Sequence, residues 1–192
     1  MRRAWANDGW AAEPEFLEEV SRHAASTRGP ILECGSGATT LVLAALAAQR
    51  GVDVWVLEHD ALWAKRLRSA LGPGRRHLIH LCAAPLRSYG DFDWYDAPWP
   101  QMPNVFRLVV CDGPPETTRG GRYGVVPLLQ NRLSPDTVLL LDNATRPKQA
   151  AALERWQREA GATFRLQESP TCAFAVARFS AHPQGRATRP IA

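Results

Sequence analysis

Apolar residues gather along this chain in short runs, separated by longer segments in which they recur at helical spacing. A run of about four to eight apolar residues bounded by turn residues is typical of a strand buried in a parallel sheet. Five runs of this kind predict parallel strands, and two later segments predict a closing antiparallel pair. The five strands are expected at 30–34, 52–57, 77–81, 106–111 and 137–141, and the pair at 163–166 and 173–179.

The segments between these runs predict helices. Acidic residues crowd the first turn of the first segment, which favours a helix start, and Asp60 is suited to cap the third helix. Alternating strands and helices predict an α/β fold: a Rossmann-like, doubly wound, mostly parallel seven-stranded sheet with helices on both faces and an antiparallel last strand. The helices are expected at 13–26, 38–49, 60–71, 125–133 and 150–160.

The most informative motif follows the first predicted strand. Glu33 ends this strand, and Gly35 and Gly37 allow a sharp turn into the next helix. Glycine loops of this kind cradle nucleotides, but the Glu33 carboxylate would repel a pyrophosphate and attract a cationic amine. Thr40 stands where a dinucleotide fingerprint needs its third glycine. The loop therefore favours S-adenosylmethionine over NAD.

Polar side chains end several of the predicted strands. In an open parallel sheet, ligands bind at the carboxyl ends of the strands. We therefore expect one rim of the sheet to gather Glu33, Glu58, Asp112, Asp142 and Asn143.

These residues resemble motifs of the class I S-adenosylmethionine-dependent methyltransferases, over about residues 30–179. The sequence Glu-Cys-Gly-Ser-Gly at 33–37 is similar to the first motif of that family, and Glu58 falls where its ribose-binding acid lies. A finer resemblance, to a small subgroup related to catechol and caffeoyl-coenzyme A O-methyltransferases, rests on residues 109–115, 122–123 and 140–143.

The resemblance implies a set of cofactor contacts. Glu33 would accept a hydrogen bond from the methionine ammonium, and Glu58 would accept from both ribose hydroxyls. Trp63 would either stack on the adenine or belong to the core. The expected cofactor site comprises Glu33, Gly35, Ser36, Gly37, Thr39, Thr40, Glu58, His59, Ala83, Ala84 and Asp112.

The same resemblance implies a divalent cation at Asp112, Asp142 and Asn143. Two carboxylates and an amide oxygen suit Mg²⁺ or Ca²⁺, and such an ion would orient an acceptor hydroxyl and lower its pKa. In the alternative, Asp112 touches cofactor or substrate and Asp142 caps the following helix, without a metal. Residues 113–119 contain no lysine, although the catechol-type enzymes place one there.

The general base is left open among Asp112, His59 and Asp142. Arg119 and residues 122–123 would either clamp an anionic or phenolic acceptor or anchor the next helix.

Residues 85–103 show neither the strand period nor the helix period. They contain four prolines and five aromatic residues, so we expect an ordered loop or lid. Its aromatic side chains, with Trp5 and Trp10, would cover a planar or hydrophobic acceptor. We expect residues 1–29 to form a helical segment over the site, 30–179 the methyltransferase domain, and 180–192 a disordered basic tail.

The predicted activity is methyl transfer from S-adenosylmethionine to an oxygen of a small, aromatic or hydrophobic acceptor, with assistance from the cation. The alternatives are a metal-independent N-methyltransferase acting on an amine, sugar or peptide, and a cofactor-binding protein without catalysis.

Length, charge and cysteine content indicate the domain number and the partners to expect. The 192 residues suit one domain, and the net charge of +4 comes mostly from scattered arginines, which argues against a nucleic-acid partner. Four cysteines show no metal-binding spacing, so we expect buried thiols.

No apolar stretch resembles a signal peptide or membrane span, so we expect a cytoplasmic protein. The sequence leaves open whether the protein forms a homodimer.

Overall fold

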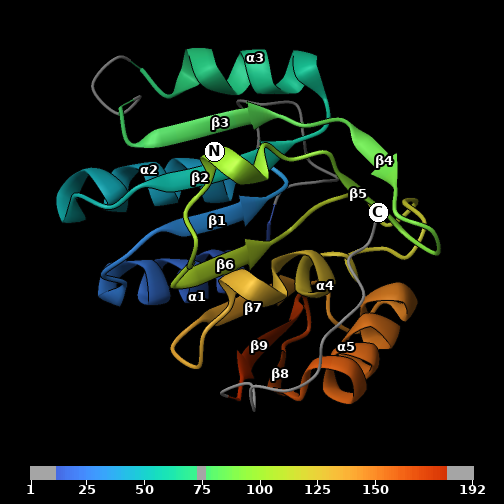
Figure 1. Cartoon of the computed structure of the whole chain (residues 1–192). Coiled ribbons are helices and arrows are strands. Elements are labelled where there is room, and N and C mark those ends of the chain that lie inside the picture. Colours follow the sequence, from blue (N-terminus) through green and yellow to red (C-terminus); the bar gives the residue numbers. More distant parts are fainter. Residues whose placement is uncertain (1–11, 73–76, 181–192) are drawn as a thin grey trace.

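The computed structural model describes residues 12–72 and 77–180. Its centre is one seven-stranded sheet in the order β3-β2-β1-β6-β7-β9-β8 (Figure 1). The strand β9 runs antiparallel to both of its neighbours, and the other pairs are parallel, as the sequence predicted. The strands are β1 (Ile31–Cys34), β2 (Val54–Glu58), β3 (Ile79–Ala83), β6 (Leu108–Cys111), β7 (Val138–Asp142), β8 (Ala162–Glu168) and β9 (Ala173–Phe179).

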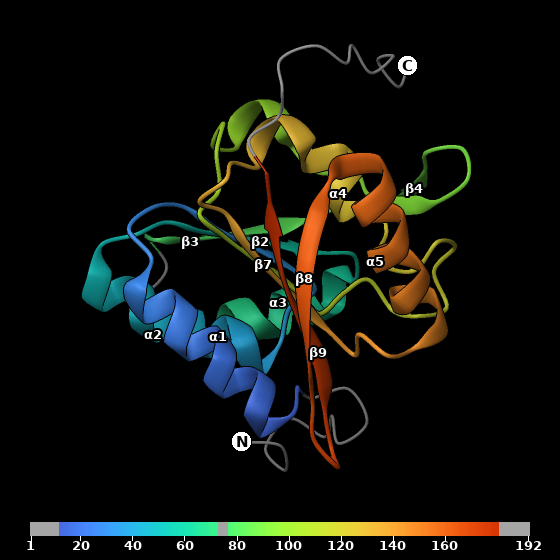
Figure 2. The same ribbon diagram turned by 90° about the horizontal axis from the view of Figure 1, so that it is seen from below.

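Helices cover both faces of the sheet. Figure 2 shows α1 (Pro14–Ser26), α2 (Ala38–Arg50) and α3 (Ala61–Ala70) on one face. The other face carries α4 (Val125–Leu129), which continues as a short 3₁₀ helix, and α5 (Pro147–Ala160). Each face has its own apolar cluster because successive strand residues point to opposite sides. The predicted doubly wound architecture is confirmed.

A side-chain cap explains where α3 begins. Asp60 Oδ1 accepts hydrogen bonds from the backbone N–H groups of Leu62 at 2.8 Å and Trp63 at 3.0 Å, so Asp60 is the predicted N-cap of α3. The helix α5 begins at Pro147, earlier than predicted, and has no side-chain cap. Asp142 therefore does not cap it.

The segment 85–103 contains secondary structure that the sequence did not reveal. Two strands, β4 (Leu86–Ser88) and β5 (Asp93–Tyr95), pair as a short hairpin, and a 3₁₀ helix follows at Trp99–Gln101. Strands of three residues are too short to display an alternating pattern, so the prediction of a loop was wrong here. The aromatic side chains also lie deeper than expected, because Phe92, Trp94 and Tyr95 are buried.

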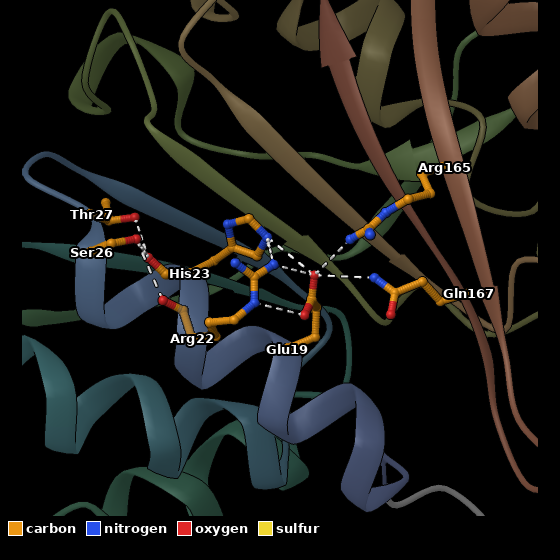
Figure 3. A network of polar contacts seen from close by, with 7 residues as sticks. All are labelled: Glu19, Arg22, His23, Ser26, Thr27, Arg165 and Gln167. Carbon is orange, nitrogen blue, oxygen red and sulfur yellow. Dashed lines mark hydrogen bonds and ion pairs between the residues drawn. The ribbon is translucent and has the colours of Figure 1, made fainter.

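A polar network fastens α1 to the edge of the sheet (Figure 3). Glu19, which is 8% exposed, accepts two hydrogen bonds from Arg22, at 3.0 and 2.6 Å, and lies 3.2 Å from His23 Nε2. Gln167 on β8 donates to the same carboxylate at 3.4 Å, and Arg165 lies 3.9 Å away. Burial of Glu19 is tolerated because each oxygen has a cationic or N–H partner.

The expected helical segment at 1–29 is described only from residue 12 onward. There α1 packs against α2 and the sheet, and its N-cap residue Glu13 reaches the cavity described below. Trp5, Trp10 and the expected tail after residue 180 lie outside the described residues.

The four cysteines are free thiols, of which three are buried and Cys82 is partly exposed. None of the described helices is long and apolar enough to cross a membrane.

Candidate functional site

A cavity of about 450 Å³ lies at the carboxyl ends of the central strands. Its walls include the residues that end or follow β1, β2, β6 and β7, which is where the strand order reverses. Ligands of open α/β sheets bind at this position. Of the rim predicted from the sequence, Glu58, Asp112, Asp142 and Asn143 line this cavity, whereas Glu33 does not.

The structure brings some of the expected cofactor residues to this cavity and leaves others outside its walls. Gly35, Ser36, Glu58, His59 and Asp112 line it, as do all three expected metal ligands. The expected residues that do not line it are Glu33, Gly37, Thr39, Thr40, Ala83 and Ala84.

Glu58 is the most highly connected carboxylate of the cavity. It ends β2, is 4% exposed, and accepts hydrogen bonds from the backbone N–H of Ser36 at 3.1 Å and its hydroxyl at 2.6 Å. The other oxygen accepts from the backbone N–H of Asp60 at 2.9 Å and lies 3.0 Å from His59 Nδ1. Burial raises the pKa of Glu58, but these contacts outweigh it and hold the pKa below its usual value. Glu58 is therefore an ionised acceptor fixed against the glycine loop.

Glu33 lies behind the glycine loop, fully buried beneath the start of α2. Thr40 links the two, since its hydroxyl donates to Glu33 at 2.6 Å and accepts from the Gly37 N–H at 3.0 Å. The second carboxylate oxygen has no hydrogen-bond partner among the described residues. Burial raises the pKa of Glu33 to about 8, so the free protein holds a proton there at neutral pH. Its contact with an ammonium group stays a prediction.

Because Glu33 is protonated in the folded protein, we expect the free energy of unfolding to depend on pH. Folding raises the pKa of Glu33 from 4.5 to about 8, so its stabilising contribution is complete below pH 4.5 and is lost as pH rises through about 8. Glu33→Gln removes this loss. The gain in thermal midpoint over the wild type, followed by circular dichroism, should be larger at about pH 9 than at about pH 6. An equal gain at both pH values would contradict the assignment.

The two loops after β1 and β6 touch through their backbones. Gly35 has a φ of +82°, and a Cβ atom placed on it would lie 2.6 Å from the backbone nitrogen of Gly113. Gly113 N–H donates to the carbonyl of Cys34 at 2.6 Å, which locks the approach. At Gly37, by contrast, nothing lies within 4 Å of the corresponding Cβ position. Gly35 is required by the fold, whereas the space beside Gly37 is open.

Arg122 occupies the junction between β6 and β7. Its side chain is 5% exposed, and Nη1 donates to the backbone carbonyls of Asp142 at 2.6 Å and Cys111 at 3.2 Å. Nη2 donates to the carbonyl of Asp112 and lies 3.3 Å from the Asp112 carboxylate. A fixed cation of the protein therefore already lies beside the acidic end of the cavity.

This arrangement fits a divalent cation poorly. Arg122 would repel a metal ion held by Asp112, and the amide nitrogen of Asn143 donates to Asp142 Oδ2. Burial and the Asp112 carboxylate raise the pKa of Asp142 to about 7. Within residues 12–72 and 77–180, no group of three histidine, cysteine or acidic side chains is arranged to hold a metal. The predicted metal site is not supported.

We expect metal removal to leave ligand binding intact. Because Arg122 supplies the positive charge at this end of the cavity, affinity for S-adenosylhomocysteine should be the same with EDTA as with Mg²⁺. Titration calorimetry with Mn²⁺ should show no saturable binding to the wild type. Stoichiometric Mn²⁺ binding that disappears in Asp142→Asn would restore the metal site.

Arg119 and Tyr123, which the sequence offered with Arg122 as a clamp for the acceptor, pack against other elements instead. Arg119 donates to Ser88 at 2.7 Å and to Asp93 at 2.6 Å, which fixes the β4–β5 hairpin. The Tyr123 hydroxyl donates to Glu159 on α5 at 2.5 Å. Neither lines the cavity.

Trp63 lines the cavity and is anchored there, because its indole N–H donates to the carbonyl of Ser36 at 2.9 Å. Several other lining residues could not be assigned to the site from the sequence. Tyr95 was expected only in a general aromatic wall, and no signal distinguishes Glu116, Arg146 or Thr171, which reach the cavity from loops.

Known structures share this fold, although the sequence matches no protein-family model and no curated protein. A precorrin-6y C5,15-methyltransferase from Geobacter metallireducens GS-15 has a TM-score of 0.61 at 12% identity, covering 91% of this chain and 96% of that one. An O-methyltransferase from Bacillus cereus in complex with SAH has a TM-score of 0.62 at 17% identity, covering 93% and 87%. The C-terminal domain of precorrin-6Y C5,15-methyltransferase from Rhodobacter capsulatus has a TM-score of 0.60 at 15% identity, covering 94% and 95%. The chain thus has the Rossmann-like fold of these methyltransferases.

Proposed function

We propose that this protein is an enzyme that transfers a methyl group from S-adenosylmethionine to a small molecule. The observation that carries the proposal is Glu58, an ionised carboxylate at the end of β2 that lines the cavity and holds the glycine loop. A carboxylate here can accept hydrogen bonds from both hydroxyls of a ribose. The fold shared with solved methyltransferases supports the same reading.

In this proposal, S-adenosylmethionine supplies a methyl group on a sulfonium, which is already a good leaving group. The protein has to orient donor and acceptor, exclude water and remove a proton. Glu58 and the glycine loop would orient the nucleoside. A contact between Glu33 and the ammonium of the amino-acid part would require Glu33, which is buried behind the loop, to lose its proton. Asp112, His59 and Asp142 all line the cavity and are candidate proton acceptors.

We propose two acceptor classes, a hydroxyl oxygen and an amine nitrogen. The oxygen acceptor follows from the resemblance to the catechol-type enzymes. The amine is favoured by one specific observation, the acidic side chains of Asp112, Glu116 and Asp142 in the lining. Two of these are paired with arginines, Asp112 with Arg122 and Glu116 with Arg146. Tyr95 and Trp63 are the aromatic residues among the described walls, because Phe92 and Trp94 pack in the core instead. This composition suits a polar acceptor better than a hydrophobic one.

Turnover tests the proposal. Purified protein is incubated with S-adenosylmethionine and EDTA, together with matched phenols and amines of the same carbon skeleton, and S-adenosylhomocysteine release is measured by mass spectrometry. We expect release that depends on an acceptor and that falls in Glu58→Ala at subsaturating S-adenosylmethionine. Tight S-adenosylmethionine binding without release from any oxygen or nitrogen acceptor would instead favour the cofactor-binding protein without catalysis.

A further inference from the structure

Tyr95 is a fully buried residue whose hydroxyl has no hydrogen-bond partner among the described residues. It ends β5 and lines the cavity. Burying a hydroxyl without a partner costs folding free energy, so such groups are rare in folded proteins. Building on the proposed function, we propose that the Tyr95 hydroxyl forms a hydrogen bond with the bound S-adenosyl ligand.

The position of the hydroxyl supports this contact. A Cβ atom placed on Gly113 would lie 2.5 Å from the Tyr95 oxygen and 2.7 Å from the Cα atom of Gly35. The oxygen therefore lies at the crossing of the two loops that follow β1 and β6. The ring of His59, next to Glu58, meets the Tyr95 ring edge-on at a centroid distance of 6.3 Å. Tyr95 is thus flanked by the residues that the proposed function assigns to the cofactor.

The hairpin holds Tyr95 rigidly in this place. Asp93 N–H donates to the carbonyl of Arg119 at 3.0 Å, and the Arg119 side chain returns a bond to the Asp93 carboxylate at 2.6 Å. The Tyr89 hydroxyl donates to the Tyr95 carbonyl at 3.3 Å, and the Trp94 ring packs edge-on at 5.3 Å. Because the backbone and ring are fixed, the hydroxyl cannot turn away to another protein partner, and the group is preorganised for a ligand.

The Tyr95 hydroxyl is suited to act as an uncharged hydrogen-bond donor to the ligand. Burial raises the pKa of Tyr95 well above its usual value, so the hydroxyl keeps its proton. It can donate to one oxygen or nitrogen atom of the ligand and accept from another group. The Trp94 indole nitrogen also lacks a hydrogen-bond partner, but Trp94 does not line the cavity. Location in the cavity wall distinguishes Tyr95 from a buried group without a role.

The test compares Tyr95→Phe with a matched control, Tyr123→Phe. Tyr123 is also a buried tyrosine, but its hydroxyl already donates to Glu159 and it lies outside the cavity walls. Affinity for S-adenosylhomocysteine is measured by titration calorimetry, and the thermal midpoint of the ligand-free protein by circular dichroism. We expect Tyr95→Phe to bind about fivefold to tenfold more weakly with an unchanged or raised midpoint. Tyr123→Phe should show the reverse pattern, a lowered midpoint with unchanged affinity.

Each other outcome overturns the assignment. Wild-type affinity in Tyr95→Phe would show that the hydroxyl does not touch the ligand. A lowered midpoint in ligand-free Tyr95→Phe would show that the hydroxyl has a partner within the protein. If the wild type itself fails to bind S-adenosylhomocysteine, the proposed function fails first, which separates that failure from one confined to Tyr95.

Discussion

Glu58→Ala should bind S-adenosylhomocysteine about thirtyfold to hundredfold more weakly than the wild type, a loss of about 2–3 kcal/mol measured by titration calorimetry. The variant loses the acceptor proposed for the ribose hydroxyls. It also releases Ser36, whose N–H and hydroxyl both donate to Glu58. Bonds to an ionised acceptor are the stronger kind, so this single change is expected to have the largest effect on binding.

The matched control for Glu58 is Asp53→Ala, at the other end of the same strand. Asp53 is an exposed carboxylate that lies 2.7 Å from His80, far from the cavity walls. Its removal should leave the affinity unchanged. Far-ultraviolet circular dichroism of both variants establishes that the fold is retained. Equal affinities for Glu58→Ala and the wild type would show that Glu58 does not contact the ribose.

Gly35→Ala should have the largest effect on stability, lowering the free energy of unfolding by about 2–4 kcal/mol and the thermal midpoint by about 10 °C. An alanine here would adopt a left-handed backbone conformation, since φ is +82°. Its Cβ atom would also lie 2.6 Å from the backbone nitrogen of Gly113, where no flexible side chain can yield. Thermal denaturation followed by circular dichroism measures the loss.

Gly37→Ala separates the two glycines of the loop. Its extended backbone suits any residue, and its Cβ position is open, so the thermal midpoint should stay at the wild-type value. A Gly37→Ala variant as unstable as Gly35→Ala, or a Gly35→Ala variant that melts like the wild type, would contradict these roles of the two glycines.

Local patterns were enough to predict most of the fold. Each buried parallel strand is a nearly continuous apolar run, and Asp60 carries its capping signal in the sequence itself. Glu58 could also be predicted to reach the cavity, because strand ends of a parallel sheet meet at one edge whatever the loops do.

The remaining features depend on contacts that the sequence does not display. The β4–β5 hairpin is too short to show a period, so its burial and the orientation of Tyr95 emerge only from packing. Arg122 contacts the backbone carbonyls of residues 111, 112 and 142, and carbonyl groups leave no trace in an amino-acid pattern. The resemblance therefore implied a metal at Asp112, Asp142 and Asn143, whereas the structure places an arginine beside Asp112.

A calorimetric titration of the wild-type protein with S-adenosylmethionine and, separately, with NAD tests which cofactor the cavity binds. We expect one molecule of S-adenosylmethionine to bind per chain with micromolar affinity and NAD to give no binding heat. Saturable binding of NAD, or no binding of S-adenosylmethionine, would contradict the proposal that the cavity beside Glu58 receives a methyl donor.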